Sequence, residues 1–169
     1  MNKIDIIKNI YRNCFGVDEE FENSLFENCQ KDLKCLEKNG TVVSFLFALP
    51  CKVKQNNSEI SAVYVFAAAT DQNHRNKGYM AELLELTKKE FNHIVLRPAN
   101  ENLIGFYKKF GFLEFIGNDK NPTDDTIEPI DSFKILTELT DKTKEGEFVL
   151  MGYGLPEDFD NVYFPYTMP

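Results

Sequence analysis

The stretch that decides the fold is residues 63–84, VYVFAAATDQNHRNKGYMAELL. Its apolar run ends at Thr70, a polar turn covers residues 71–76, and an amphipathic pattern follows. The pattern predicts a strand, a loop and a helix in this order. The first turn of a helix has unpaired backbone N–H groups and a partial positive charge, which suit a phosphate group. Arg75 and Lys77 add two formal positive charges at the same point, so the stretch predicts an anion-binding loop.

Gly78 lies at the mouth of the predicted helix, where the lack of a Cβ lets the backbone come close to a ligand. Residues 75–80 read RNKGYM and resemble the R/Q-x-x-G-x-G/A pyrophosphate loop of the GNAT superfamily of acetyl-CoA-dependent N-acetyltransferases. Met80 stands where the family has a small residue, and Gln72 stands where it often has a proline.

A second segment strengthens this resemblance. Residues 100–112, NENLIGFYKKFGF, are similar to the family's N-x6-Y-x3-G-F segment, with Asn100 and Tyr107 at its first two fixed positions. Both motifs fall within residues 63–115, in the order and at the separation that the family's fold requires.

The resemblance implies a GNAT fold, which is an α/β architecture. Its mixed central sheet has flanking helices, and its fourth and fifth strands splay apart. We expect a single domain over residues 1–169, with the core motifs in 63–115 and a C-terminal extension with the last strand in 117–169. Residues 1–3 are too short for the family's first strand, so we expect that strand to be short or missing.

Hydrophobic periodicity and turn residues predict the elements in chain order. A helix ends at Gly16, and Asp18 caps a second one. Asn39-Gly40 predicts a tight hairpin, because this pair supplies the positive φ angles that such a turn needs. The other predicted elements are strands at 33–37, 42–49, 60–70, 93–97 and 112–116, and helices at 78–91 and 100–110. Pro50 predicts an end or a bulge after the second of these strands, which continues in kinked form over 51–54.

The pattern is weaker after residue 117. Residues 118–126 are polar and predict a loop, and residues 131–139 predict a short helix capped by Asp131. Residues 147–153 and 162–167 are both candidates for the family's last strand, and the sequence does not rank them.

Composition limits the function classes. The chain has 169 residues, 43% of them hydrophobic, and a net charge of −8. Such a charge argues against nucleic acid and anionic membranes as partners. There is no apolar run of membrane-spanning length and no signal-peptide core, so we expect a cytoplasmic protein with no membrane partner and leave a homodimer open. The two histidines and four cysteines show no ligand spacing, so we expect no metal.

The resemblance also implies the chemistry. Backbone N–H groups near the end of the splayed strand hold and polarise the acetyl carbonyl. Tyr107 protonates the CoA sulfur as a general acid, and a phenol remains protonated at neutral pH. Asn100 contacts the pantetheine arm or caps its own helix, and His74 is exposed or touches a phosphate. The residues expected to bind acetyl-CoA are Ala68, Ala69, Thr70, Arg75, Asn76, Lys77, Gly78, Tyr79, Met80 and Asn100.

The general base stays open between three candidates, which are Glu59, Tyr64 and the terminal carboxylate of Pro169. We expect an N-acetyltransferase that uses acetyl-CoA as co-substrate, and a primary amine of a small molecule or peptide attacks the thioester directly in a ternary complex. One alternative is a CoA-binding or sensor module with the same fold and no transfer activity. Another is an α/β interaction domain in which the motifs are accidental. The identity of the acceptor cannot be read from these residues.

Overall fold

The computed structural model describes residues 1–140 and 145–166. The helices are α1 (Lys3–Phe15), α2 (Glu19–Asn28), α3 (Tyr79–Glu90), α4 (Asn102–Lys108) and α5 (Asp131–Thr137), with short 3-10 turns η1 (Gln30–Asp32) and η2 (Gln72–His74). The strands are β1 (Leu33–Lys38), β2 (Thr41–Gln55), β3 (Ser58–Thr70), β4 (Ile94–Leu96), β5 (Leu113–Asn118), β6 (Asp125–Pro129), β7 (Glu147–Tyr153) and β8 (Val162–Tyr163).

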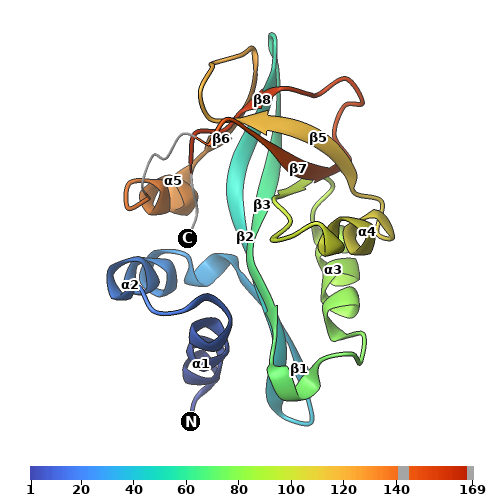
Figure 1. Cartoon of the computed structure of the whole chain (residues 1–169). Coiled ribbons are helices and arrows are strands. Elements are labelled where there is room, and N and C mark those ends of the chain that lie inside the picture. The colour runs from blue at the N-terminus through green and yellow to red at the C-terminus, as the bar shows by residue number, and fades with distance from the viewer. Residues whose placement is uncertain (141–144, 167–169) are drawn as a thin grey trace.

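All strands belong to one mixed sheet in the order β1-β2-β3-β4-β7-β5-β8-β6. β6 also pairs with the second half of β2, so the sheet curls back on itself at that end (Figure 1). The pairs β3–β4, β5–β8 and β6–β8 are parallel, and the others are antiparallel. The mixed α/β sheet with flanking helices is therefore the predicted GNAT architecture.

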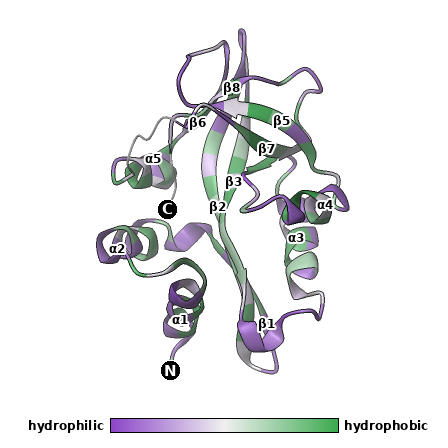
Figure 2. Cartoon of the chain, viewed as in Figure 1, coloured by the Kyte–Doolittle hydropathy of each residue, from purple (hydrophilic) through white to green (hydrophobic). Residues whose placement is uncertain are grey.

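Helices cover both faces of this sheet. Figure 1 shows α1, α2 and α5 on one side and α3 and α4 on the other. The long central strand β2 packs against both layers, because successive side chains of a strand point to opposite faces. Phe45, Phe47 and Leu49 join the core under α1, α2 and α5, whereas Leu46 and Ala48 join the core under α3 and α4. Most of β2 and β3 is accordingly green in the hydropathy colouring of Figure 2.

A bulge in β3 breaks this alternation near its carboxyl end. The register of β2 against β3 shifts between Phe45 and Phe47, and Ala67 has a φ of 57°. Such a φ is uncommon for a residue other than glycine, and bulges of this kind turn a strand away from its neighbour. Small side chains at Ala67, Ala68 and Ala69 let the backbone make this turn.

The same part of β3 separates from β4. The two strands pair only where Val63 and Tyr64 lie beside Ile94 and Val95. β3 then continues to Thr70 with no partner on that side among the described residues, whereas β4 ends at Leu96. The predicted splay of two parallel strands is confirmed, and it opens a V-shaped fork between them.

Several predicted boundaries need correction. β2 continues through Pro50, which pairs with Val63 without a shift of register, so the proline marks neither an end nor a bulge of the strand. Residues 118–126 are not all loop, because β5 extends to Asn118 and the unpredicted β6 begins at Asp125. Ile130, not Asp131, occupies the N-cap position of α5.

The ends of the chain bear on two further predictions. α1 begins at Lys3, so no strand precedes it among the described residues. Residues 147–153 form β7, which lies between β4 and β5 in the middle of the sheet, and this segment is therefore the last long strand. Residues 162–163 form the two-residue β8, whereas residue 167 of that predicted strand lies outside the described residues.

Candidate active site

The predicted anion-binding loop joins β3 to α3. Gly78 is the N-cap of α3 with a φ of 79°, and Asn76 before it has a φ of 63°. A Cβ placed on Gly78 would meet no protein atom within 4 Å, so this backbone faces open space. The positive φ is the reason for glycine here, and the open space leaves the N–H groups of the first α3 turn accessible to a ligand.

Arg75 is anchored beside this loop. Its Nε donates to the backbone oxygen of Thr70 at 3.2 Å, and its Nη2 lies 3.5 Å from the Sγ of Cys14 in α1. His74 is paired with Asp71, with its Nδ1 2.6 Å from a carboxylate oxygen. The loop is therefore held at three points, and the guanidinium remains exposed next to the helix mouth.

A cavity of about 600 Å³ lies over this loop, and we call it the glycine-loop cavity. It is lined by nine of the ten residues expected to bind acetyl-CoA, and Lys77 is the exception. Lys77 is exposed and is not among the lining residues, so it is the one predicted cofactor residue that the cavity does not bring together with the others. The lining residues are Cys14, Phe15, Ala68, Ala69, Thr70, His74, Arg75, Asn76, Gly78, Tyr79, Met80, Ala81, Asn100, Leu103, Phe106 and Tyr107.

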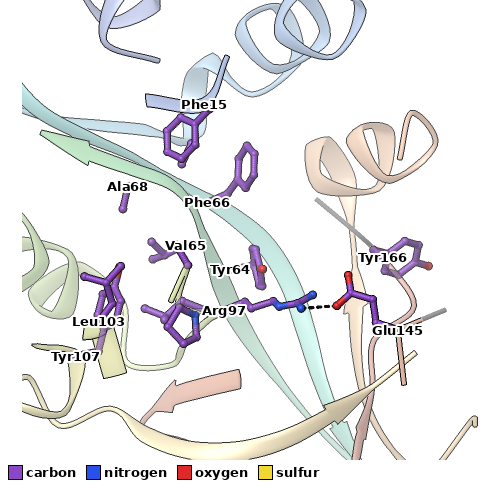
Figure 3. Close-up of a pocket in the computed structure, with 14 residues that line it drawn as sticks. Phe15, Tyr64, Val65, Phe66, Ala68, Arg97, Leu103, Tyr107, Glu145 and Tyr166 are labelled. Carbon is purple, nitrogen blue, oxygen red and sulfur yellow. Dashed lines mark hydrogen bonds and ion pairs between the residues drawn. The ribbon is translucent and has the colours of Figure 1, made fainter. Parts of the chain in front are cut away.

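A second cavity of about 400 Å³ fills the V between β3 and β4, and we call it the fork cavity. Figure 3 shows its lining side chains, with Arg97 reaching across the floor to Glu145. The lining residues are Phe15, Tyr64, Val65, Phe66, Ala67, Ala68, Leu96, Arg97, Pro98, Ala99, Leu103, Tyr107, Glu145 and Tyr166.

The two cavities share four lining residues, which are Phe15, Ala68, Leu103 and Tyr107. They therefore meet at the bulged end of β3, opposite the inner face of α4. A ligand that enters through the glycine-loop cavity and one that enters through the fork cavity can come into contact there.

Tyr107 is the polar group at this junction. Its side chain is 7% exposed and packs edge-on against Phe106 and Phe112. Burial raises the pKa of its phenol from 10.0 to about 12. Every buried side-chain N or O atom of the described residues has a hydrogen-bond partner, and no described group bonds the Tyr107 hydroxyl. The hydroxyl must therefore reach the cavity, where it is a proton donor at neutral pH.

Asn100 makes the hydrogen bond expected of a residue that caps its own helix. Its Oδ1 accepts a hydrogen bond of 3.3 Å from the Leu103 N–H in the first turn of α4. Its side chain also lines the glycine-loop cavity. The amide nitrogen is the part of this side chain that a pantetheine carbonyl could use.

The three candidates for the general base fare differently. Glu59 lies at the far end of β3, is paired with Lys52 at 2.8 Å and does not line either cavity. Tyr64 lines the fork cavity, but burial raises the pKa of its phenol, which makes it a poor proton acceptor. Pro169 lies outside the described residues.

Arg97 and Glu145 are site residues that sequence reasoning missed. The Nη2 of Arg97 lies 2.7 Å from a carboxylate oxygen of Glu145, and its guanidinium lies 4.3 Å from the centre of the Phe148 ring. Asp119 accepts hydrogen bonds from the backbone N–H groups of Glu145 and Gly146. Although burial alone would raise it, these bonds hold the pKa of Asp119 below its usual range.

No group of three or more histidine, cysteine or acidic side chains could hold a metal ion within residues 1–140 and 145–166. The helices in the same residues include none that is long and apolar enough to cross a membrane.

A family model for the acetyltransferase (GNAT) domain matches residues 2–114. The chain therefore belongs to the GNAT acetyltransferase family. No curated protein matches the chain.

Solved structures with this fold include GNAT enzymes of several organisms. A GCN5-related N-acetyltransferase from Anabaena variabilis has a TM-score of 0.56 at 18% identity, over 68% of this chain and 31% of that one. The ribosomal-protein-S18-alanine N-acetyltransferase from Escherichia coli has a TM-score of 0.50 at 18% identity, over 97% and 96%. Naa50 from Arabidopsis thaliana, in complex with the bisubstrate analogue CoA-Ac-MVNAL, has a TM-score of 0.51 at 16% identity, over 92% and 95%.

These similarities concern the fold. This chain covers only about a third of three longer chains with the same fold, at 31%, 34% and 34% of their lengths. It covers nearly the whole of the Escherichia coli and Arabidopsis thaliana chains.

Proposed function

We propose that this protein transfers the acetyl group of acetyl-CoA to a primary amine of a small molecule or peptide. The observation that carries the proposal is the junction of the two cavities at Tyr107 and Ala68. The glycine-loop cavity takes the cofactor, and the fork cavity takes the amine. Both reactants then meet in one ternary complex, which is the arrangement that direct attack requires.

Arg75 and the first turn of α3 bind the pyrophosphate in this proposal. Gly78 exposes the N–H groups at the helix mouth, and the guanidinium beside them adds a full positive charge. Asn76, Tyr79 and Met80 line the same part of the cavity.

The unpaired edge of β3 holds the thioester. From the bulge onward no described strand pairs with it on the β4 side, so backbone groups near Ala68 and Thr70 are available to the pantetheine arm and the acetyl carbonyl. An N–H group fixed in this way stabilises the negative charge that develops on the carbonyl oxygen during attack.

Tyr107 completes the proton balance. The amine nitrogen attacks the acetyl carbon, the new C–N bond forms, and the carbon–sulfur bond breaks. The leaving thiolate takes the proton of the Tyr107 phenol. The proton that the amine loses then restores the phenol from its phenolate form. The raised pKa keeps this phenol protonated over the whole physiological range.

Two of the structures with this fold are consistent with an amine acceptor. The Escherichia coli enzyme is named for an alanine of ribosomal protein S18, and the Arabidopsis thaliana structure contains an analogue that joins CoA to a peptide. At these identities they support the proposal by fold only.

A thermal-shift titration with acetyl-CoA, CoA and desulfo-CoA tests the cofactor site. A ligand that binds only the native state adds about 2.7 kcal/mol of stability at 100 times its Kd, so we expect a clear rise of the unfolding midpoint with all three. An unchanged midpoint at millimolar ligand would remove the cofactor assignment. A shift without acetylated product for any amine would leave a CoA-binding module.

A further inference from the structure

We infer that the amine which this protein acetylates is attached to an apolar, aromatic group and carries no second positive charge. The inference rests on the proposed function and assigns a chemical class to the acceptor. It comes from the aromatic rings and the ion pair that line the fork cavity.

Besides Tyr107 of α4, four aromatic rings line the fork cavity, from three other parts of the chain (Figure 3). Tyr64 and Phe66 come from β3, Phe15 comes from the end of α1, and Tyr166 follows β8. Tyr64 and Phe66 are only 4% and 7% exposed, whereas Phe15 is 41% exposed and stands where the two cavities meet. An exposed ring of this size beside a cavity is a surface on which a second ring can stack.

Neighbouring side chains fix these rings in place. Tyr64 stacks on Phe133 with ring centres 5.3 Å apart, and Phe66 packs edge-on against Phe21 at 5.7 Å. Rings that are held in this way bind a flat apolar group with little loss of their own conformational freedom.

The charges of the cavity cancel each other. Glu145 is the one carboxylate among the described lining residues, and it is already paired with Arg97 at 2.7 Å. Arg97 is in turn held over the ring of Phe148. Among the described lining residues, no unpaired carboxylate compensates the second ammonium group of a polyamine or aminoglycoside for the hydration that it loses here.

The size of the cavity is consistent with a small aromatic group. A volume of about 400 Å³ lies near the lower end of the range for small-molecule sites. The same chemistry occurs in a free arylalkylamine and in a peptide whose first residue is aromatic. Phenethylamine and a tripeptide that begins with phenylalanine represent these two sources in the test below.

The test measures amine binding to protein saturated with desulfo-CoA, by titration calorimetry. We expect phenethylamine or the tripeptide to bind at least tenfold more tightly than spermidine or kanamycin. Whichever of the two aromatic ligands binds more tightly shows whether the acceptor is a free arylalkylamine or a peptide. Equal or tighter binding of spermidine or kanamycin overturns the inference, whether or not transfer occurs. Initial rates with acetyl-CoA and the same amines test the proposed function separately, because they report transfer and not affinity.

A charge variant makes the test specific. Arg97→Met leaves Glu145 unpaired, so we expect the affinity for spermidine to rise about tenfold relative to phenethylamine. The double variant Arg97→Met with Glu145→Gln should reverse this gain, because the free carboxylate is gone. A ratio of affinities that stays at the wild-type value in the single variant, with an unchanged unfolding midpoint, contradicts the role of the pair.

A ring variant tests the aromatic contact. Phe15→Ala should weaken phenethylamine binding about tenfold and leave spermidine binding unchanged, because only the aromatic ligand uses the ring. Leu113→Ala is the matched control, since Leu113 is 64% exposed and lines neither cavity. Equal losses for both amines in Phe15→Ala would show a general disturbance of the site and would overturn the stacking argument.

Discussion

The glycine-loop cavity and the fork cavity meet at Tyr107, but they are built in different ways. The first is shaped by backbone, with Gly78 at the mouth of α3 and the bulged end of β3 as its walls. The second is shaped by side chains, with aromatic rings around an ion pair between Arg97 and Glu145. A backbone site can bind the same cofactor while its surroundings vary, whereas a side-chain site changes its ligand with each substitution.

This difference predicts which variants affect which ligand. Changes in the loop before α3 should act on the cofactor and leave the amine alone. Changes in the ion pair and in the rings that line only the fork cavity should act on the amine and leave the cofactor alone. A variant of one cavity that altered only the ligand of the other would break the comparison.

The largest effect is expected from Gly78→Glu. A side chain at this position points into the open space over the helix mouth, and its negative charge opposes the phosphates of the cofactor. We expect the affinity for acetyl-CoA to fall by at least about 100-fold, which corresponds to about 2.7 kcal/mol at 1.36 kcal/mol per factor of ten. Titration calorimetry measures the change directly.

Backbone strain is the alternative cause, and the chain offers a matched control. Gly40 in the β1–β2 hairpin has a φ of 78°, close to the 79° of Gly78, and a Cβ there also meets no atom within 4 Å. Gly40→Glu therefore adds the same charge and the same strain outside both cavities. Equal losses of cofactor affinity in the two variants would remove the loop assignment.

The next largest effect is expected from Tyr107→Phe. The variant keeps the ring that packs against Phe112 and removes the proton donor. General acid catalysis contributes about 10²- to 10⁴-fold, so we expect kcat to fall within this range while the Kd for acetyl-CoA stays within about twofold. Steady-state rates and calorimetry together separate the two quantities.

Tyr11→Phe is the control for this variant. Burial also raises the pKa of Tyr11 to about 12, but Tyr11 lines neither cavity.

The phenol of Tyr107 is protonated below its raised pKa, so wild-type kcat should show no loss from this group until the pH approaches about 12. Unchanged kcat in Tyr107→Phe would make Tyr107 a packing residue.

Local signals made much of the fold predictable. Asn39 and Gly40 have φ values of 51° and 78°, as a tight hairpin with this pair requires. The continuous apolar run of β2 and the helical spacing in α3 likewise follow from neighbours in sequence. β6 could not be found in this way, because residues 125–129 become a strand only by pairing with β2 and β8, which lie far away in the chain.

The same distinction between local signals and contacts of distant residues applies to the site. Arg75 and Gly78 act through the loop in which they stand, so a short motif is enough to find them. Arg97 and Glu145 are 48 residues apart and come together only through the fold, because β7 inserts beside β4. No spacing in the sequence indicates such a pair, which explains why the motifs predict residues of the glycine-loop cavity and do not predict this pair.

The smallest effect separates two cations that the motif treats alike. Arg75 lines the glycine-loop cavity and is anchored to the Thr70 carbonyl, whereas Lys77 is exposed outside the lining. A hydrogen bond to a charged group contributes about 1.5 kcal/mol or more, so Arg75→Gln should weaken acetyl-CoA binding about tenfold.

Lys77→Gln is the matched control with the same loss of charge, and we expect a change of less than about twofold because solvent screens a charge in that position. Calorimetry at two salt concentrations measures both losses. If Lys77→Gln equals Arg75→Gln at high salt as well as at low salt, Lys77 contacts the cofactor directly and the loop must close over it on binding.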